Sequence, residues 1–583
     1  MLASASPENS VSLMLLEGGL TLIAVAVPFA LPRLGTAWFS GIERLFGRLA
    51  RSKGNAVAAV GLAALLLRLA ILPFCPIPLP FIHDDFSFLL AANTFAHGRL
   101  TNPTPAMWIH FESIHITMQP TYMSMYFPAV GLVLAAGKVL FGNPWFGILC
   151  ASALMCAAIC WMLQAWLPPT WALLGGVLAI LRLGLFSYWV NTHSAGGSVA
   201  ALGGALVLGA LPRLTKKPCL RYGLLLAVGI VLLATTRPYE GLLLCFPASA
   251  YLGHWLLFGK NRPSAARLLR LSALPLALIV AAGAWLAYYD YRAFGKPTTL
   301  PYTVNRATYA IAPYYVWQSA RPEPSYHHES MRYFYLHNEL DAYAKIHKLS
   351  GFLPQTVVKV IRSFEFYAGF ALLPPLFMIR RILLDRRIRF LVLCVLVLAS
   401  GMVIEIFLIP HYLAPFTAAF YAIGLQGMRH LRVWKPGGQP VGLTMVRLMV
   451  TICLILCCLR LFPGPLHLAL AEWPASSWTD NWYGPDHFGT ERARVERSME
   501  QLPGPQLLIV RYSSLHNPLN EWVYNAPDID DSKVVWAREM DGPHNLELMH
   551  YYASRKAWLV EPDSLPAVVS PYPVPQESVA DLH

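Results

Sequence analysis

The stretch AVAAVGLAALLLRLAILPFCPIPLPFIHDD, residues 56–85, joins a long apolar run to two adjacent carboxylates. Residues 55–74 are apolar apart from Arg68 and are long enough to cross the hydrocarbon core of a bilayer as a helix. Asp84 and Asp85 follow about ten residues beyond the end of that run. The sequence therefore predicts a membrane span followed by a loop that carries an acidic pair.

The composition of the whole chain agrees with this interpretation. Of the 583 residues 56% are hydrophobic and 13% are charged, and the mean hydropathy is +0.47, outside the range of soluble globular domains. The first apolar run, VSLMLLEGGLTLIAVAVPFALP (11–32), lacks a basic leader and a small-residue cleavage site, so we interpret it as a span rather than a signal peptide. The fold class predicted is a mainly α, polytopic membrane protein.

Apolar runs of spanning length predict about 12 crossings. They are expected near 13–32, 55–74, 145–166, 170–187, 197–212, 222–236, 241–258, 271–289, 363–379, 390–408, 411–427 and 444–462. Residues 126–142 hold Lys138 and begin at a proline-containing turn, so we expect this segment to lie along the membrane, with a thirteenth crossing as the alternative.

The formal net charge of +13 does not indicate nucleic-acid binding, because the basic residues fall in short clusters between apolar runs. Such loops stay in the cytoplasm by the positive-inside rule. We therefore expect a multi-pass protein of the bacterial plasma membrane whose other loops are extracytoplasmic. The basic clusters are Arg33, Arg44, Arg48, Arg51 and Lys53; Arg213, Lys216, Lys217 and Arg221; Lys260, Arg262, Arg267 and Arg270; Arg380, Arg381, Arg386, Arg387 and Arg389; and Arg429, Arg432, Lys435 and Arg447.

Two parts of the chain differ in composition. Residues 1–462 form the membrane part, with external loops expected at 75–125 and 290–360, whereas residues 463–583 hold 17 acidic and 8 basic residues. In that tail QLLIVRY, KVVWARE and KAWLVEPD are typical of strands, and NLELMHYYAS fits an amphipathic helix. The tail is predicted to be a small extracytoplasmic α/β domain.

The acidic pair has two interpretations. His-Asp-Asp at the start of the helix-like run FSFLLAANTFAHG suits helix N-capping, in which a carboxylate accepts from free N–H groups. Capping needs one side chain, so the other carboxylate could face a cavity at the membrane surface. There it would act as a general base or bind a divalent metal ion.

Other polar residues fall on the same predicted side. Arg237 and Glu240 lie in TTRPYEG, a short turn between two spans at the depth of a lipid phosphate, and His411 and Tyr412 lie at another helix junction. An arginine donates two parallel hydrogen bonds to a phosphate. The alternative is an interfacial Arg–Glu pair that anchors the helix ends. HFESIH supplies His110, Glu112 and His115, which could ligate a metal with Asp84 or Asp85, although loop histidines are usually solvated.

At this point the chain resembles a known group. LLAANTFAHGRLTNP behind the acidic pair, QPTYMSMYFPAVGLVLAAGKVLFGNPW after it and the later IPHYLAPFTAAFYAIG are similar to motifs of the GT-C glycosyltransferases that use polyprenyl-phosphate sugars. That group includes protein mannosyltransferases and bacterial aminoarabinose and galacturonic-acid transferases. The resemblance covers roughly residues 55–430. It rests on the order of the segments more than on any one motif.

The resemblance implies a mechanism. An acceptor hydroxyl attacks the anomeric carbon of a sugar linked to a membrane polyprenyl phosphate. Asp84 and Asp85 would be the catalytic carboxylates, as base or metal ligand, and Arg237, His411 and Tyr412 would lie at the donor phosphate. Glu112, His115, His193 and Glu240 are further candidates for substrate or metal contacts, and the cofactor implied is a divalent metal ion. The partners expected are that donor, a glycan, lipid or protein acceptor, and the bilayer, with no nucleic acid.

This chain also departs from the group. Met125 and Phe127 stand where a basic residue and a proline are common, and His193 and Ser194 replace a tyrosine and a tryptophan. Two rival functions remain open at this level: a permease, and a scaffold of envelope assembly that kept the fold without catalysis. A transporter would show internal repeats and midplane charges. In this sequence no internal repeat is visible, and the predicted membrane interior is almost free of charge.

Overall fold

This computed structural model describes residues 11–194, 196–462, 465–466, 468–469 and 489–573. Within those ranges seven helices are long and apolar enough to cross a membrane, each at a predicted crossing, so the protein is a multi-pass membrane protein. They are α1 (Leu13–Ala30), α3 (Lys53–Ala70), α6 (Trp145–Trp166), α9 (Gly197–Lys216), α11 (Pro238–Phe258), α12 (Ala265–Phe294) and α20 (Val441–Leu459).

Four predicted crossings form shorter helices. They are α7 (Pro169–Ala179), which a π-helical turn at Ile180–Gly184 continues, α10 (Leu220–Thr236), α18 (Arg389–Val403) and α19 (Thr417–Arg432). The last of these begins later than the predicted 411–427, because Pro410 and Pro415 hold a 3₁₀ turn over Pro410–Phe416.

The crossing predicted at 363–379 does not form one continuous helix. Helix α16 (Leu349–Tyr367) ends there, and the helical segment Phe370–Leu384, which closes with α17 (Ile379–Leu384), turns away from it by 87°. Gly369 adopts a φ of +62° at the break, and Pro374 and Pro375 follow. A left-handed glycine and two prolines do not continue a straight α-helix, whatever the hydropathy of the segment.

The freed backbone groups at this break are satisfied by charged side chains. Glu17 of α1 accepts from the N–H of Ala371 at 3.0 Å, and Arg182 donates to the carbonyl of Glu365 at 2.8 Å. The two side chains also pair with each other at 3.2 Å. Irregular backbone at membrane depth requires such internal partners.

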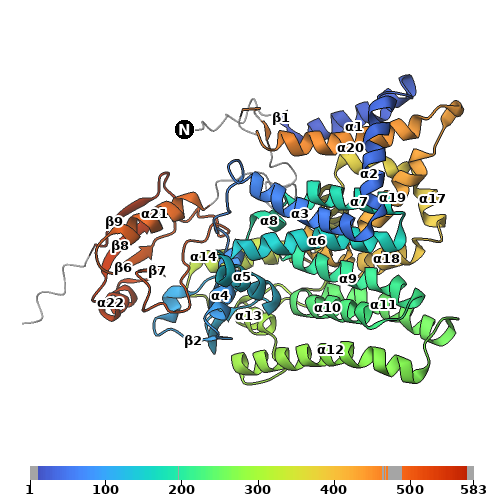
Figure 1. Ribbon diagram of the computed structural model, residues 1–583. Helices are drawn as coiled ribbons and strands as arrows, with labels where there is room; N and C mark the ends of the chain where they lie inside the picture. Colours follow the sequence, from blue (N-terminus) through green and yellow to red (C-terminus); the bar gives the residue numbers. More distant parts are fainter. Residues whose placement is uncertain (1–10, 195, 463–464, 467, 470–488, 574–583) are drawn as a thin grey trace, which may run out of the picture.

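The helices run side by side between two ends of the molecule (Figure 1). At the polar end lie α4 (His83–Ala96), α13 (Pro301–Tyr309), α14 (Glu329–Tyr333) and the C-terminal sheet. At the basic end α2 (Thr36–Arg51) places Glu43 against Arg432 and Arg447, at 3.1 and 2.9 Å. These two arginines belong to one of the basic clusters of the sequence.

Helix α5 (Pro128–Phe141), predicted to lie along the membrane, packs between α4 and α6. Its Gly137 and Gly147 of α6 let the two backbones approach closely, since a Cβ added at either would collide with main-chain atoms of the other helix. This contact ties the polar end to the central helices.

The loop between α4 and α5 forms a small antiparallel sheet. Its strands are β2 (Asn102–Pro103), β3 (Ile116–Thr117) and β4 (Thr121–Ser124), in the order β2-β4-β3. The short helix α8 (Tyr188–Asn191) follows the π-helical turn.

The C-terminal part forms a four-stranded sheet in the order β7-β6-β8-β9. Strands β6 (Gln506–Val510), β7 (Val534–Arg538) and β8 (Lys556–Glu561) are parallel, and β9 (Val568–Pro571) is antiparallel to β8. The three strands and α22 (Gly542–Tyr551) were predicted, whereas α21 (Thr490–Gln501) and β9 were not. A two-residue parallel pair joins β1 (Val11–Ser12) to β5 (Leu468–Ala469).

The sheet shares a hydrophobic core with the loop after α4. Phe111, Ile116 and Tyr122 of that loop pack with Leu507 and Val535 of the sheet in one buried cluster. Burial of a common apolar face fixes the sheet against the membrane part.

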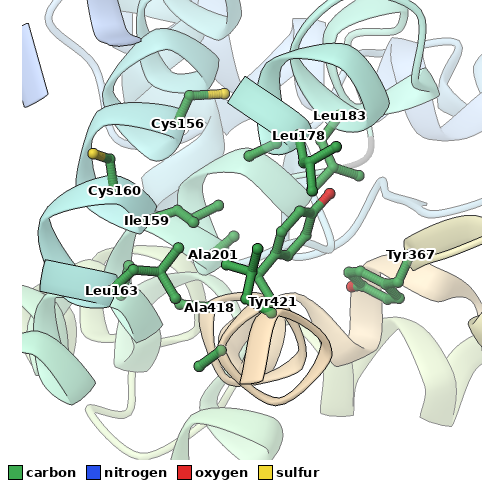
Figure 2. Packing of buried hydrophobic residues seen from close by; sticks show 14 of the residues in the cluster. Cys156, Ile159, Cys160, Leu163, Leu178, Leu183, Ala201, Tyr367, Ala418 and Tyr421 are labelled. Atoms are coloured by element: carbon green, nitrogen blue, oxygen red, sulfur yellow. The ribbon is translucent and has the colours of Figure 1, made fainter. Parts of the chain in front are cut away.

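The largest core lies between the central helices. Ile159 and Leu163 of α6 face Leu178 of α7 and Tyr421 of α19 (Figure 2). Small residues such as Ala201 of α9 and Ala418 of α19 let these helices approach (Figure 2).

Candidate functional site

Asp84 lies in the first turn of α4, at the polar end. Helix α4 begins at His83, and its N-cap residue Ile82 makes no side-chain cap. In the second turn the ring of Phe88 stacks on that of Tyr126, with centroids 4.2 Å apart. Neither aspartate of the pair caps the helix, because their carboxylates bond to other elements. The N-capping interpretation is therefore wrong.

Three side chains surround the Asp84 carboxylate. His115 Nδ1 donates to Oδ1 at 2.6 Å, the Tyr126 hydroxyl donates to the same oxygen, and His83 Nε2 lies 3.4 Å away. Ser87 donates to the backbone carbonyl of His115 at 2.7 Å, which fixes that residue at its φ of +63°. The carboxylate stays 22% exposed, so a substrate can reach it.

These contacts keep Asp84 ionised. Burial alone would raise the pKa of Asp84, but the neighbouring His83 and His115 and the hydrogen bonds from His115 and Tyr126 outweigh it, and the net pKa is lowered. Burial also lowers the pKa of His83 to about 4, so this imidazole is neutral at pH 7. A permanent carboxylate beside a neutral imidazole is suited to bind a cation or to orient a base.

Asp85 faces away from this group. Its carboxylate accepts the backbone N–H of His193 at 2.9 Å and that of Phe81 at 3.5 Å, and it is 1% exposed. Burial raises the pKa of Asp85 to about 7. Asp85 therefore joins α4 to the segment after α8, and it contacts the backbone of His193 rather than its ring.

The residues predicted at the donor phosphate come together. The Arg237 guanidinium lies 4.1 Å from the centroid of the Tyr412 ring and 3.7 Å from Glu240. His411, which precedes Tyr412 in the sequence, belongs to the same group. The Tyr188 hydroxyl lies 2.9 Å from Nδ1 of His411.

This arginine group is continuous with the Asp84 group. Asp84 and Arg237 both lie within electrostatic range of His411. Tyr302 links the two, because its ring contacts that of Tyr126 at 5.5 Å and lies within electrostatic range of Arg237. One cluster thus holds an ionised carboxylate and an arginine.

Two predicted metal ligands lie elsewhere. Glu112 accepts from the Tyr309 hydroxyl and from His327 Nδ1, both at 2.7 Å, and burial raises its pKa. His110 Nδ1 donates to the carbonyl of Arg538 at 3.1 Å. Of the three residues in HFESIH, His115 alone joins Asp84.

His83, Tyr126 and Tyr302 were not among the candidates named from the sequence. The signal for His83 was its position next to Asp84. Tyr126 stands inside the quoted QPTYMSMYFPAVGLVLAAGKVLFGNPW, between Met125 and Phe127, the two departures from the group. Nothing in the sequence singles out Tyr302, which reaches Tyr126 through the tertiary fold.

Three residues can hold a metal ion. Among the described residues His83, Asp84 and His115 are the group whose ligand atoms all lie within 4.8 Å of one another. Two imidazole nitrogens and a carboxylate are a ligand set used for zinc and related divalent ions, and three protein ligands leave a position open for substrate. The donor set therefore fits a divalent ion.

An apolar cavity of about 420 Å³ lies between α16, α18 and α19. Its lining is almost entirely hydrophobic and includes Tyr367, Gly424 and, at one polar point, Lys359. The Lys359 ammonium donates to the backbone carbonyl of Glu405, and Glu405 lies within electrostatic range of Arg237. The polar point of the cavity is thereby linked to the arginine group.

Comparison with known proteins gives distant structural matches. No family model and no curated protein matches the chain. Similar solved structures include ArnT from Cupriavidus metallidurans in the apo state, with 11% identity, a TM-score of 0.45 and coverage of 86% of this chain and 93% of that one. The Archaeoglobus fulgidus oligosaccharyltransferase in complex with Zn and sulfate is 9% identical, with a TM-score of 0.42 and coverage of 87% and 67%. The oligosaccharyltransferase AglB of that organism, in complex with an inhibitory peptide and a dolichol-phosphate, is 10% identical, with a TM-score of 0.41 and coverage of 86% and 69%.

Proposed function

We propose that this protein is a membrane glycosyltransferase that moves a sugar from a polyprenyl-phosphate donor to an envelope acceptor. The observation that carries the proposal is the single cluster in which the ionised Asp84 carboxylate and the Arg237 guanidinium meet through Tyr126 and Tyr302. An anion that orients a nucleophile and a cation that binds a leaving phosphate are the two charges this transfer needs.

The bonds change as follows. The acceptor oxygen forms a bond to the anomeric carbon, the bond from that carbon to the phosphate oxygen breaks, and the electron pair leaves on the polyprenyl phosphate. Arg237 is placed to bind the phosphate as its charge grows. The proton of the acceptor hydroxyl goes to a base on the protein.

His115 is the better candidate for that base. The lowered pKa of Asp84 makes its carboxylate a weak proton acceptor. Its hydrogen bond to Nδ1 instead orients the His115 ring and leaves Nε2 as the nitrogen that can take a proton. If His83, Asp84 and His115 instead held a divalent ion, that ion would supply a Lewis acid, and His115 would be a ligand rather than the base.

The apolar cavity supports a lipid carrier for the donor. It is lined by hydrophobic side chains of α16, α18 and α19 and has Lys359 at its polar point. A polyprenyl chain would bury apolar surface there while its phosphate stays near the arginine group. We propose that the polar end faces the outside of a bacterial plasma membrane, where the basic clusters would be cytoplasmic.

The test is mass spectrometry of polysaccharide, lipid and protein fractions of the envelope from cells with and without the gene. One fraction should lose a sugar without the gene, regain it with the wild-type gene, and fail to regain it with Asp84→Asn. Unchanged fractions would reject glycosyl transfer. Restoration by Asp84→Asn would favour the non-catalytic scaffold, and a permease would instead transport a solute into proteoliposomes.

A further inference from the structure

A second polar pocket lies at the carboxyl ends of β6 and β7. Its volume is about 370 Å³, within the range of small-ligand sites of roughly 300–1,000 Å³. Its walls come from residues 327–333, 510–516 and 538–539. None of the residues of the Asp84 cluster or of the apolar cavity lines this pocket.

The topology of the sheet favours a ligand at this edge. In the order β7-β6-β8 the chain runs from the central strand β6 to β7 on one side. It then crosses to β8 on the other side of β6. Open parallel sheets bind ligands at the carboxyl ends of their strands, and the pocket lies at that edge, beside β6 and β7 rather than between β6 and β8, where the direction changes. Val510 and Arg538, the last residues of β6 and β7, both line the pocket.

The walls of the pocket are held in place by hydrogen bonds. Asp563 accepts from the N–H of Ser513 at 2.8 Å and from His516 Nδ1 at 2.6 Å. The His516 ring stacks on Tyr512 with centroids 3.9 Å apart. A preformed wall lowers the entropy lost when a ligand binds.

The pocket shares a wall with the Asp84 cluster. Tyr333 lines the pocket, while the ring of the next residue, Phe334, contacts His83 at 5.1 Å and His115 at 5.8 Å. Arg538 also lines the pocket and pairs with Glu521 at 2.5 Å, and Glu521 lies within electrostatic range of His83. A ligand in the pocket would therefore sit next to the cluster that carries out the transfer.

The lining has the chemistry of a site for a neutral polyhydroxylated ligand. Arg511 donates two hydrogen bonds to Glu539, at 2.5 and 2.7 Å, so neither sign of charge prevails in this part of the wall. Planar guanidinium and carboxylate groups pair with adjacent hydroxyls, and the 45%-exposed ring of Tyr333 offers a flat apolar face. We propose that the pocket binds a sugar residue of the acceptor, and hence that the acceptor is a glycan; this inference rests on the proposed function.

The experiment combines the envelope fractions with direct binding. The probe is the polysaccharide fraction from cells that lack the gene, titrated against purified full-length protein in nanodiscs. We expect Tyr333→Ala to weaken binding at least tenfold. Tyr551→Ala removes an equally exposed tyrosine outside this pocket, and binding should be unchanged. Asp84→Asn should also bind normally, because it leaves the pocket intact.

The outcomes separate the two proposals. Loss of a sugar from the polysaccharide fraction in gene-lacking cells, partial restoration by Tyr333→Ala and full restoration by Tyr551→Ala would support the pocket as the acceptor site. Loss of a sugar from the lipid or protein fraction, or equal binding by Tyr333→Ala and wild type, would overturn the glycan assignment and leave glycosyl transfer standing. No change in any fraction would instead reject glycosyl transfer.

Discussion

Asp84 and Asp85 are neighbours in the sequence, but their carboxylates face different parts of the molecule. Asp84 accepts from His115 at 2.6 Å, whereas Asp85 accepts from the backbone N–H of His193 at 2.9 Å. One carboxylate is therefore available for chemistry and the other holds two segments together. Substitutions at the two positions should have separable effects.

Asp84→Asn should lower the turnover number by at least 100-fold while the protein stays folded at the assay temperature. The amide removes the negative charge that orients His115 or binds a cation. Asp85→Asn should keep more than a tenth of the turnover, because its carboxylate contacts backbone away from the cluster. Sugar transfer in nanodiscs and thermal unfolding measure the two quantities. Equal turnover losses in the two variants would contradict this division of roles.

The pH dependence of the melting temperature should show that Asp85 is protonated in the folded protein at mildly acidic pH. Burial raises its pKa from the ordinary value of 3.8 to about 7, so the folded protein holds a proton that the unfolded chain releases. The contribution of Asp85 to the free energy of unfolding therefore falls as the pH rises from about 4 to about 7. Asp85→Asn should gain melting temperature relative to wild type between pH 5 and pH 8.

Asp84→Asn is the control for this measurement. The lowered pKa of Asp84 confines its proton uptake to pH values below its ordinary 3.8. The difference in melting temperature between this variant and wild type should be flat from pH 5 to pH 8. A flat difference for Asp85→Asn as well would show that Asp85 is ionised throughout.

Arg237→Ala should raise the apparent KM for the polyprenyl donor about tenfold and that for the acceptor less than twofold. The guanidinium is held by Tyr412 and Glu240 beside the cluster, where it can bind a phosphate. Initial rates with each substrate varied in turn measure both constants. Arg262→Ala, at an exposed position of a basic loop, should leave both unchanged. Equal effects of Arg237→Ala on the two constants would favour a helix anchor.

Gly424→Trp should block use of a long-chain donor. Gly424 lines the apolar cavity, and a Cβ at this position meets nothing within 4 Å, so the indole can enter the cavity without a backbone clash. Gly253→Trp is the matched control, because its Cβ is equally free and the residue does not line the cavity. Turnover of a donor with a short, soluble prenyl chain should survive in both variants. Undiminished turnover of the long-chain donor by Gly424→Trp would show that the prenyl chain does not bind in this cavity.

The orientation of the protein can be tested with engineered cysteines. In a background without the native thiols, a membrane-impermeant maleimide should label cysteines at Ser325 and Ser554 in intact spheroplasts, but not one at Ser52. All three positions are exposed, so accessibility depends on the side of the membrane. Labelling of the cysteine at position 52, with no labelling at positions 325 and 554, would show the opposite orientation in the membrane. It would exclude a donor whose head group lies on the outer side.

Hydropathy predicted the positions of the helices along the sequence. It did not predict the residues at which helices begin, break or end. The seven long spans and the strands β6, β7 and β8 fall where the sequence placed them, since long apolar runs and apolar strands are local signals. The break after Tyr367 was missed because hydropathy averages over Gly369 and the two prolines that follow.

The candidate site could be predicted only in part. Asp84 and Arg237 stand out because charged residues are rare beside apolar runs. Of the partners of Asp84, His115 was named from the sequence as a possible co-ligand, but it could not be separated there from His110 and Glu112. Tyr126 could not be derived, because it lies 42 residues away and reaches Asp84 through the strand pairing of the loop. Glu112 illustrates the same limit, because its neighbours are His327 and Tyr309 from a much later segment.

The contact between Glu17 and the backbone at Ala371 joins parts of the chain that are synthesised at very different times. Glu17 belongs to the first span, but the N–H that it binds, on Ala371, emerges from the ribosome more than 350 residues later. Helix α1 also packs against α20, the last span of the described chain. Within the described chain, the complete set of native contacts of α1 can therefore form only after α20 has been synthesised.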